Sequence, residues 1–361
     1  MKTNRKKVII FPLGAYAFCT GVIILNHRLK EENCSVEEMT AGGYAYPYIE
    51  PSLLERALDL LGELLVFSCG FTFEGNLILP SGDDRWMVRI AEKNNVRPVL
   101  VLTPFSQGAF HNQLVRVILE NRLIQDRVIA QLCTLTEEQG YRGVDIDFEN
   151  IPPADRVRYA KFVGRVRERL SESGCSVSVA VTPIISDSQK GLAVEGMDYA
   201  LLGESADRVF LKTYEWGYVY GPPMAVAPLD KVRQVVEYAL TKIPAEKLIL
   251  GIPNYGYDWT LPYERGITRA RMVGSREAEE TAAENGVVIR HAEIAQSPWF
   301  TYVKGGAEHA VWFENARSLT AKWELARKFG LAGVRYWNLM REFPGGFTPS
   351  LAGRRSASGT G

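Results

Sequence analysis

The sequence has few cysteines, and their arrangement argues against two kinds of protein. Only five occur among 361 residues, and no CxxC pair or histidine cluster accompanies them: Cys19, Cys34, Cys69, Cys133 and Cys175. Structural zinc sites need closely spaced ligand pairs, and disulfide frameworks are typical of short secreted chains. We therefore expect free thiols, no metal site and no disulfide framework.

An excess of charge of either sign is also missing. The chain carries 42 basic and 42 acidic residues, so its formal net charge is zero. No basic stripe with interleaved aromatic residues is present, and the sequence therefore predicts no nucleic-acid partner. No GxGxxG or other phosphate-binding loop follows an early strand, which argues against a dinucleotide-binding fold.

One long uncharged run lies near the N-terminus. The basic stretch "MKTNRKK" is followed by about 18 mostly apolar residues at 8–25, as in a signal peptide or a membrane anchor. Basic residues at the start would keep the N-terminus in the cytoplasm and direct the rest outward. Residues 1–38 are therefore predicted to be such a segment, with a buried hydrophobic segment as the alternative. The glycine- and serine-rich tail at 351–361 is predicted to be disordered.

Between these ends, short apolar runs alternate with amphipathic stretches. About eight predicted strands are mostly separated by helices, which indicates an α/β protein with a parallel sheet and right-handed crossovers. Over residues 39–350 this pattern favours a closed (β/α)8 TIM barrel over an open doubly wound sheet. The stretch "KLILGIPNYGYDW" at 247–259 is predicted as one strand, the seventh. The next connection is too long, so a small α+β insertion is predicted at 260–316, as one wall of a cleft.

The most informative segment is "GVDIDFE" at 143–149. Its acids Asp145, Asp147 and Glu149 alternate with apolar residues, so in a strand they share one face. Three carboxylates in a space of low dielectric constant repel one another and lose hydration, and folding alone does not favour that arrangement. The pattern predicts a functional pocket at the C-terminal ends of the strands, with Asp145 deepest and Glu149 at the rim.

This segment also carries a family resemblance. It matches most of the DGxDxDxE signature of glycoside hydrolase family 18, the chitinase-like barrels. Further matches follow in order: "TYEW" at 213–216, "GIPNYGYDW" at 251–259 and "YW" at 336–337. Within the family, the sequence resembles the peptidoglycan-directed branch, the spore-cortex-lytic and spore germination N-acetylglucosaminidases. The resemblance covers about residues 40–344.

The resemblance implies a retaining, substrate-assisted hydrolysis of β-1,4 links next to N-acetylglucosamine, in which the sugar's acetamido oxygen attacks the anomeric carbon. Glu149 would protonate the leaving oxygen, which calls for a raised pKa. Asp147 would hold the acetamide N–H, with Asp145 behind it. Tyr214 would donate its hydroxyl to the acetamido group, and Trp337 would form the apolar floor under the sugar.

The remaining implications concern substrate contacts and surroundings. Tyr255, Trp216 and Tyr46 are further candidate substrate-binding residues, and this chemistry needs no metal or organic cofactor. The expected partner is peptidoglycan or another N-acetylglucosamine-containing glycan, met by a monomer at the cell envelope, outside the cell or on the spore. Three alternatives stay open: a chitinase or chito-oligosaccharide hydrolase, a catalytically silent carbohydrate-binding barrel, and a structural spore-coat component.

Two positions depart from the family pattern. Arg142 stands where the signature has its first acid, at a position expected deep in the barrel. Lys212 occupies the usual methionine position two residues before Tyr214, so its side chain is expected to point into the pocket. It would either favour ionised carboxylates and lower the pKa of Glu149, or pair with Asp145 and leave the chemistry intact.

Overall fold

The computed structural model describes residues 39–79, 84–106, 108–343 and 346 of the chain. The predicted N-terminal signal or anchor segment at 1–38 and the predicted disordered tail at 351–361 lie outside these residues. Within the described part, none of the helices has the length and apolar character needed to cross a membrane.

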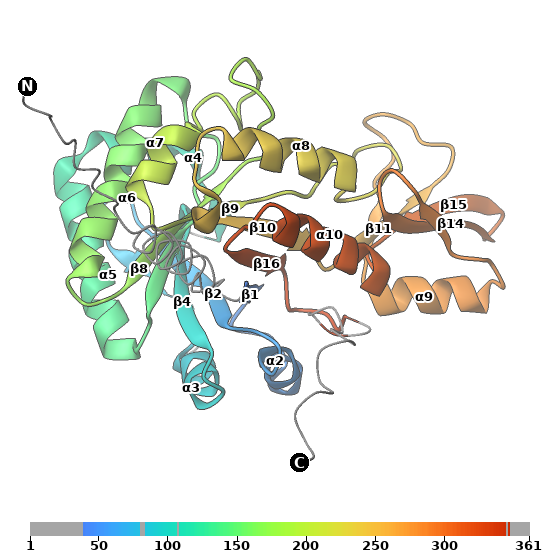
Figure 1. The fold of residues 1–361 in the computed structure, drawn as a ribbon, viewed down its shortest axis with the longest axis horizontal. Coiled ribbons are helices and arrows are strands. Elements are labelled where there is room, and N and C mark those ends of the chain that lie inside the picture. Colours follow the sequence, from blue (N-terminus) through green and yellow to red (C-terminus); the bar gives the residue numbers. More distant parts are fainter. Residues whose placement is uncertain (1–38, 80–83, 107, 344–345, 347–361) are drawn as a thin grey trace, which may run out of the picture. The chain divides into compact units, whose positions relative to one another are not determined.

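Eight parallel strands close into a barrel within the described residues, which confirms the predicted (β/α)8 fold (Figure 1). Each strand pairs with the next along the chain, and β1 pairs with both β2 and β16, which closes the ring. The barrel strands are β1 (Thr40–Ala45), β2 (Glu63–Phe71), β4 (Arg97–Leu102), β7 (Gly143–Ile146), β8 (Ser176–Val181), β9 (Arg208–Leu211), β10 (Leu248–Pro253) and β16 (Gly333–Trp337). The short β3 (Leu77–Ile78) pairs antiparallel with β2, and β5 (Phe105–Ser106) and β6 (Ala109–Phe110) form a small hairpin after β4.

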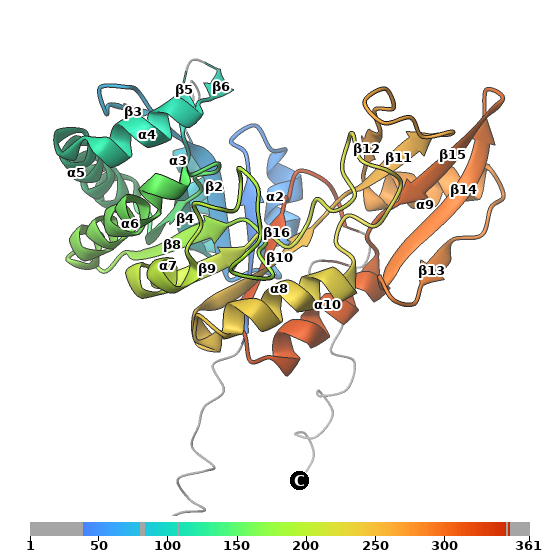
Figure 2. The same ribbon diagram turned by 90° about the horizontal axis from the view of Figure 1, so that it is seen from above.

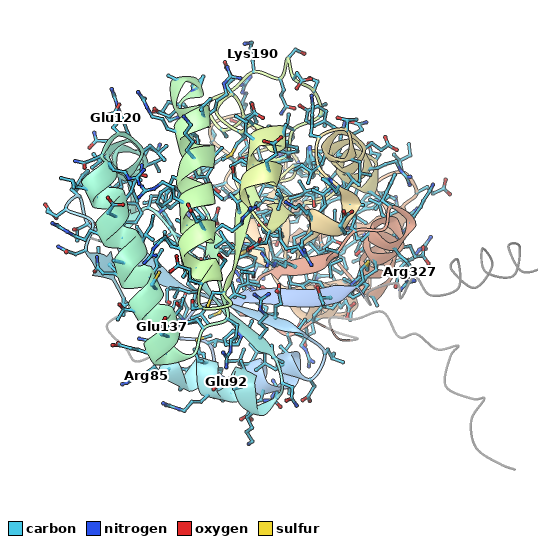
Figure 3. All side chains as sticks on the ribbon, turned by 60° about the vertical axis from the view of Figure 1, so that its left-hand side comes forward. Arg85, Glu92, Glu120, Glu137, Lys190 and Arg327 are labelled. Atoms are coloured by element: carbon cyan, nitrogen blue, oxygen red, sulfur yellow. The ribbon has the colours of Figure 1, made fainter. Side chains whose placement is uncertain are left out.

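Helices connect these strands and cover the outside of the barrel. They are α2 (Pro51–Leu58), α3 (Arg85–Lys93), α4 (Asn112–Glu120), α5 (Arg122–Gln139), α6 (Arg156–Ser171), α7 (Tyr199–Ser205), α8 (Leu229–Leu240) and α10 (Ala316–Lys328), with short 3-10 turns at Pro153–Asp155 and Ala245–Lys247. Their apolar residues recur at helical spacing and face the strands. Charged side chains such as Glu120, Glu137 and Arg327 lie on the outer surface (Figure 3).

The apolar residues of the acidic segment show how this packing works. Phe148 is fully buried and stacks on two rings of α6, with centroid distances of 5.9 Å to Tyr159 and 5.8 Å to Phe162. The apolar face of the segment therefore packs on a helix, as its alternating pattern predicts, and the acids face the other way.

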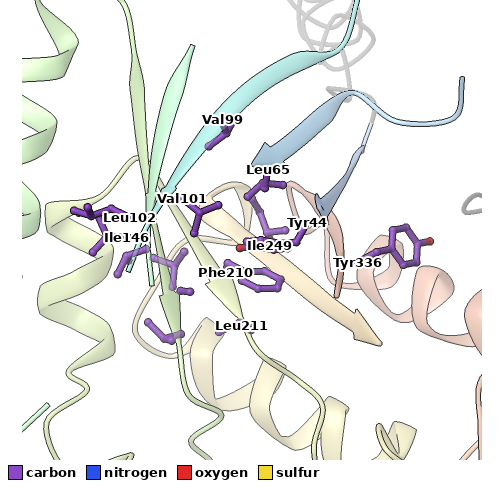
Figure 4. Close-up of a cluster of buried hydrophobic side chains, with 14 of the residues drawn as sticks. Tyr44, Leu65, Val99, Val101, Leu102, Ile146, Phe210, Leu211, Ile249 and Tyr336 are labelled. Atoms are coloured by element: carbon purple, nitrogen blue, oxygen red, sulfur yellow. The ribbon is translucent and has the colours of Figure 1, made fainter. Parts of the chain in front are cut away.

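The barrel interior is filled with side chains. Figure 4 shows buried residues from several strands gathered there, among them Leu65, Phe210 and Ile249. The rings of Tyr44 on β1 and Phe210 on β9 lie 5.3 Å apart, although these strands are not neighbours in the sheet. The interior is thus a packed core that supports whatever lies above it at the strand ends.

A second, antiparallel sheet lies in the chain between β10 and α10 (Figure 2). Its strand order is β12-β11-β15-β14-β13, formed by β11 (Gly256–Thr260), β12 (Arg271–Val273), β13 (Arg290–Ala292), β14 (Ser297–Lys304) and β15 (Ala307–Trp312). Helix α9 (Ser275–Glu284) covers one face, where Ala278 and Ala282 join a small core with Phe300 and Val311.

The single strand predicted at 247–259 is wrong, because this stretch forms β10 and β11 in two different sheets. The strand is interrupted at Asn254, between β10 and β11. The side-chain amide of Asn254 donates to the carbonyl oxygens of Asn338 (3.0 Å) and Arg341 (2.9 Å). Apolar residues continue on both sides of the break, so the periodicity of the sequence does not reveal it.

A buried charge network, which we call the lower network, crosses the barrel interior between β2, β7 and β16. Arg335 on β16 is 2% exposed and donates to Asp145 Oδ1 from Nη1 (3.0 Å) and to Glu63 Oε2 from Nη2 (2.9 Å). Arg97 donates to the other oxygen of Glu63 at 3.1 Å. Burial alone would raise the pKa of Glu63, but the two guanidinium groups outweigh it and lower that pKa. The two guanidinium groups thus stabilise the buried carboxylates.

We predict that Arg335→Met lowers the free energy of unfolding by about 3–5 kcal/mol at pH 7, because it leaves buried carboxylates without their cation. Urea denaturation measures the change. The difference from wild type should narrow as the pH falls, since protonation of Glu63 removes the charge that Arg335 compensates. The control is Arg56→Met, which removes an exposed ion pair with Glu342 and should cost less than about 1 kcal/mol. Equal losses in the two variants would contradict this reading of the network.

Candidate active site

The acidic segment rises from the barrel interior to its C-terminal end. Strand β7 ends at Ile146, and the backbone N–H of Asp147 still donates to the carbonyl oxygen of Leu102 on β4 at 3.0 Å. Exposure grows along the segment in the predicted order: Asp145 is 0% exposed, and the side chains of Asp147 and Glu149 are 12% and 57% exposed. Glu149 is therefore the acid that a molecule from solution reaches first.

Asp145 is fixed at the bottom of this series. Its Oδ2 accepts a hydrogen bond from the Tyr44 hydroxyl at 2.9 Å, and its Oδ1 accepts from Arg335 at 3.0 Å and from the Ser178 hydroxyl. Because its partner cation is Arg335, the predicted alternative in which Lys212 pairs with Asp145 is wrong. These three donors hold the Asp145 carboxyl in one orientation.

Lys212 instead contacts the two upper acids. It follows β9, is 9% exposed, and donates from Nζ to Asp147 Oδ1 at 2.8 Å and to Glu149 Oε1. Burial disfavours the ammonium, but the two carboxylates outweigh this and raise the pKa of Lys212. The side chain therefore points into the pocket, as the sequence predicts, and carries a positive charge there.

This ammonium acts in opposite ways on its two partners. The charge of Lys212 lowers the pKa of Glu149 more than burial raises it. At Asp147 burial is the larger effect and raises the pKa, although Lys212 opposes it. The raised pKa expected for Glu149 is therefore wrong, and the open alternative of a lowered pKa holds.

Arg142 does not lie where the sequence analysis expects it. Its side chain is exposed, and the residue precedes the first residue of β7, Gly143. The prediction of a deep position is wrong because the chain has not yet entered the barrel at this residue. Arg142 therefore lies at the opposite end of β7 from Asp147 and Glu149.

Tyr214 lies beside the acids and is 9% exposed. Burial, and then the charges of Asp147 and Glu149, raise its pKa well above the ordinary value, so its hydroxyl keeps its proton. Its ring fits against Gly251 of β10, where a Cβ would lie 3.0 Å from Tyr214 Cε1 and 2.4 Å from the carbonyl oxygen of Leu211. The absence of a side chain at Gly251 thus leaves room for the Tyr214 ring, whose hydroxyl is a hydrogen-bond donor.

Aromatic rings form a surface next to the acids. Trp337, at the end of β16, is half-buried, and its ring centroid lies 5.4 Å from that of Tyr44, 6.1 Å from Tyr46 and 5.1 Å from Phe67. Tyr46 in turn stacks on the exposed Tyr48 at 5.3 Å. The structure thus brings the predicted residues Trp337 and Tyr46 together, and adds Phe67, which the sequence analysis did not single out.

Glu215 is a second residue that the sequence analysis missed. Its backbone has φ of 67°, a left-handed conformation that is uncommon outside glycine, and its Oε1 accepts hydrogen bonds from Tyr255 and, at 3.1 Å, from Tyr257. Burial raises the pKa of Glu215, although the two hydroxyls oppose this. Only its place beside Tyr214 in the "TYEW" motif could have drawn attention to it.

The other two predicted substrate-binding residues have mainly structural contacts. Tyr255 is 3% exposed and its hydroxyl is engaged by Glu215. Trp216 is half-buried against the barrel core, and its backbone N–H donates to the carbonyl oxygen of Val226 at 3.0 Å. Both lie in the segments that follow β9 and β10, so they support the rim of the site.

Comparisons with known proteins agree with this geometry. The sequence model of Glycosyl hydrolases family 18 matches residues 111–342. The cortical fragment-lytic enzyme of Bacillus subtilis (strain 168) is 36% identical over 308 residues, which cover 82% of this chain and 71% of that protein. The putative sporulation-specific glycosylase YdhD of the same organism is 30% identical over 322 residues, which cover 87% and 74%.

Solved structures give the same result. The spore cortex-lytic enzyme SleL of Bacillus megaterium QM B1551 superimposes with a TM-score of 0.80 at 36% identity, covering 85% of this chain and 72% of that one. A chitinase from Chromobacterium violaceum, at 23% identity and a TM-score of 0.76 over 84% and 95% of the two chains, shares the fold. The chain therefore belongs to glycosyl hydrolase family 18 and is a glycosidase.

Proposed function

We propose that this glycosidase hydrolyses β-1,4 links next to N-acetylglucosamine in peptidoglycan, with the spore cortex as its first candidate substrate. One observation carries the proposal: Asp147, Glu149, Tyr214 and Trp337 gather at the C-terminal end of the barrel. The chain that holds them is 36% identical to proteins named for lysis of cortical fragments and spore cortex.

The mechanism that fits these residues is substrate-assisted and retaining. Asp147, fixed just beyond the strand end, would accept the N–H of the sugar's acetamido group, and the Tyr214 hydroxyl would donate to that group. The acetamido oxygen then forms a bond to the anomeric carbon. The glycosidic C–O bond breaks, and Glu149 gives its proton to the leaving oxygen. In the second step water attacks the anomeric carbon, the bond between that carbon and the acetamido oxygen breaks, and Glu149 takes a proton from the water.

Aromatic side chains would supply the apolar contacts to the sugar. The ring of Trp337 lies at the strand ends and would form the floor beneath the pyranose. Phe67 lies between Trp337 and the exposed Phe110, with its centroid 5.1 Å from the first and 6.4 Å from the second. Large exposed aromatic surface of this kind is typical of binding sites.

The remaining assignments are proposals of the same kind. Residues 39–350 would form the catalytic unit and act as a monomer, with residues 260–316 as one wall of the cleft. Residues 1–38 would export the chain or anchor it to a membrane, so that it meets its glycan at the cell envelope or the spore.

We predict that Glu149→Gln lowers kcat on purified cortex muropeptides at least 100-fold, because the glutamine amide is too weak an acid to protonate the leaving oxygen. Mass spectrometry of the fragments, with chitin oligomers assayed in parallel, identifies the substrate. The matched control, Glu120→Gln, changes an exposed residue of α4 paired with Arg116 and should leave the rate unchanged.

Two results would oppose this proposal. Equal rates for wild type and Glu149→Gln would remove the glycosidase mechanism assigned to Glu149. Binding of glycan without cleavage by the wild type would favour a silent carbohydrate-binding barrel.

Trp337→Ala should reduce kcat/KM by tenfold or more, about 1.4 kcal/mol of transition-state stabilisation, because the sugar loses its apolar floor. Trp337→Phe should restore most of that loss. Steady-state kinetics on the same muropeptides measures both, with Trp86→Ala on α3 as a half-buried control. A Trp337→Ala enzyme with unchanged kcat/KM would show that this ring only packs.

A further inference from the structure

The Lys212 side chain has no task in the mechanism proposed above, yet it lies in the middle of the site. It is a buried ammonium, 9% exposed, placed at the end of β9. Placing a charge in such a position costs free energy unless partners compensate it. Its partners are the two carboxyl groups that the reaction would use.

The contacts of Lys212 are selective. Nζ donates to Asp147 Oδ1 at 2.8 Å and to Glu149 Oε1. Asp145, two residues before Asp147, instead accepts a hydrogen bond from Arg335, which lies on β16 across the barrel interior. The charge of Lys212 therefore acts mainly on Asp147 and Glu149.

Other charged and titratable groups lie near the acidic segment, but none of those named below forms an ion pair with Glu149 as Lys212 does. Besides Asp145 and Asp147 of the segment itself, the groups that interact with it are Tyr159 of α6, Lys212 and Tyr214 after β9, Tyr44 and Tyr46 of the first strand and the turn after it, and Arg335 of β16. Glu215 interacts with Tyr214 rather than with the segment. Of these, only Lys212 and Arg335 are cations. Arg335 is engaged by Glu63 and Asp145. Within the part of the chain that the structure describes, Lys212 is the cation paired with Glu149.

An ammonium that donates to a carboxylate oxygen favours the ionised carboxyl. A general acid must carry its proton when the leaving group departs. The lowered pKa of Glu149 agrees with this, because the charge of Lys212 is its largest cause. At Asp147 burial outweighs the same ammonium and raises the pKa. The ion pair between Lys212 and Glu149 therefore opposes the proposed proton transfer to the leaving oxygen.

We propose that Lys212 is a positioning residue that holds the Glu149 carboxyl ionised and directed toward Asp147 before substrate binds, and thereby restricts the enzyme to acidic conditions. The inference rests on the proposed function, since it assumes that Glu149 is the proton donor. It assigns to this lysine a control over pH range that an apolar side chain at the same position would not exert.

The sign of the expected effect follows from the role of the proton. Activity requires protonated Glu149 and is lost as the pH rises through the pKa of that group, which gives the basic limb of the kcat/KM profile. Removing the cation raises this pKa, so the basic limb moves to higher pH. An opposite charge at hydrogen-bond distance shifts a pKa by about 1–3 units. One pH unit above the wild-type limb, Lys212→Met should therefore retain a fraction of its maximal activity about five to eleven times that of the wild type.

The experiment compares pH profiles of kcat/KM for the wild type and three variants of Lys212. Lys212→Met and Lys212→Gln remove the charge and should both move the basic limb upward, and either one suffices if the other does not fold. Lys212→Arg keeps the charge and should leave the limb near its wild-type position. The control is Lys247→Met, because Lys247 donates to the backbone oxygens of Gly203 (2.7 Å) and Ala206 (3.0 Å), and should not move the limb.

A second readout needs no turnover. A 13C NMR titration of glutamate-labelled protein follows the Glu149 carboxyl directly, and its signal is the one missing from Glu149→Gln. Removing the Lys212 charge should shift its midpoint upward by one unit or more. An unmoved midpoint, or an unmoved basic limb in an enzyme that still cleaves glycan, overturns the role of Lys212 and leaves the proposed function standing. Loss of the proposed function appears separately, as wild type and Glu149→Gln having equal activity.

Discussion

The structure depends on the compensation of charge inside a closed barrel. Carboxylates do not enter a packed interior of low dielectric constant unless cations or hydrogen-bond donors meet them. Arg335 meets two of them in the lower barrel, Asp145 and Glu63, and Lys212 meets Asp147 and Glu149 at the strand ends. Without these two cations the acidic face of the β7 segment would be an unstable feature of the fold.

The two cations differ in what they allow. The Arg335 side chain is 3% exposed and has partners on several strands, so the network around it fixes the positions of its acids. Lys212 contacts Glu149, whose side chain is 57% exposed and therefore open to a sugar. In the mechanism that we propose, the buried network around Arg335 would position the more exposed acids above it, among them the proton donor Glu149. Tyr214 and Trp337 add a hydroxyl donor and an apolar surface to this site.

Much of this architecture could be predicted from the sequence, because it follows from local patterns. Alternation along the acidic segment places Phe148 on α6 and the acids on the opposite face, as the structure shows. The alternating strands and helices likewise predict a barrel. Lys212 was expected to point into the pocket because it lies two residues before Tyr214 and so shares its face.

What could not be predicted depends on contacts between distant residues. The partner of Asp145 is Arg335, 190 residues away, and only the closed strand register brings the two together. The break at Asn254 is hidden because apolar residues continue through it. The place of Glu215 depends on a left-handed backbone that no local pattern indicates. The prediction of a deep position for Arg142 fails because the family signature begins one residue before the first residue of β7.

The most direct test of the whole account is the binding of a thiazoline analogue of the oxazolinium intermediate. If Asp147 holds the acetamido-derived ring, calorimetry should show that Asp147→Asn binds this analogue at least 100-fold more weakly than the wild type. The control Asp187→Asn, at an exposed residue paired with Lys242, should bind it as the wild type does. Equal affinity of wild type and Asp147→Asn, or no binding to either, would contradict the claim that these compensated carboxyls serve an amino sugar.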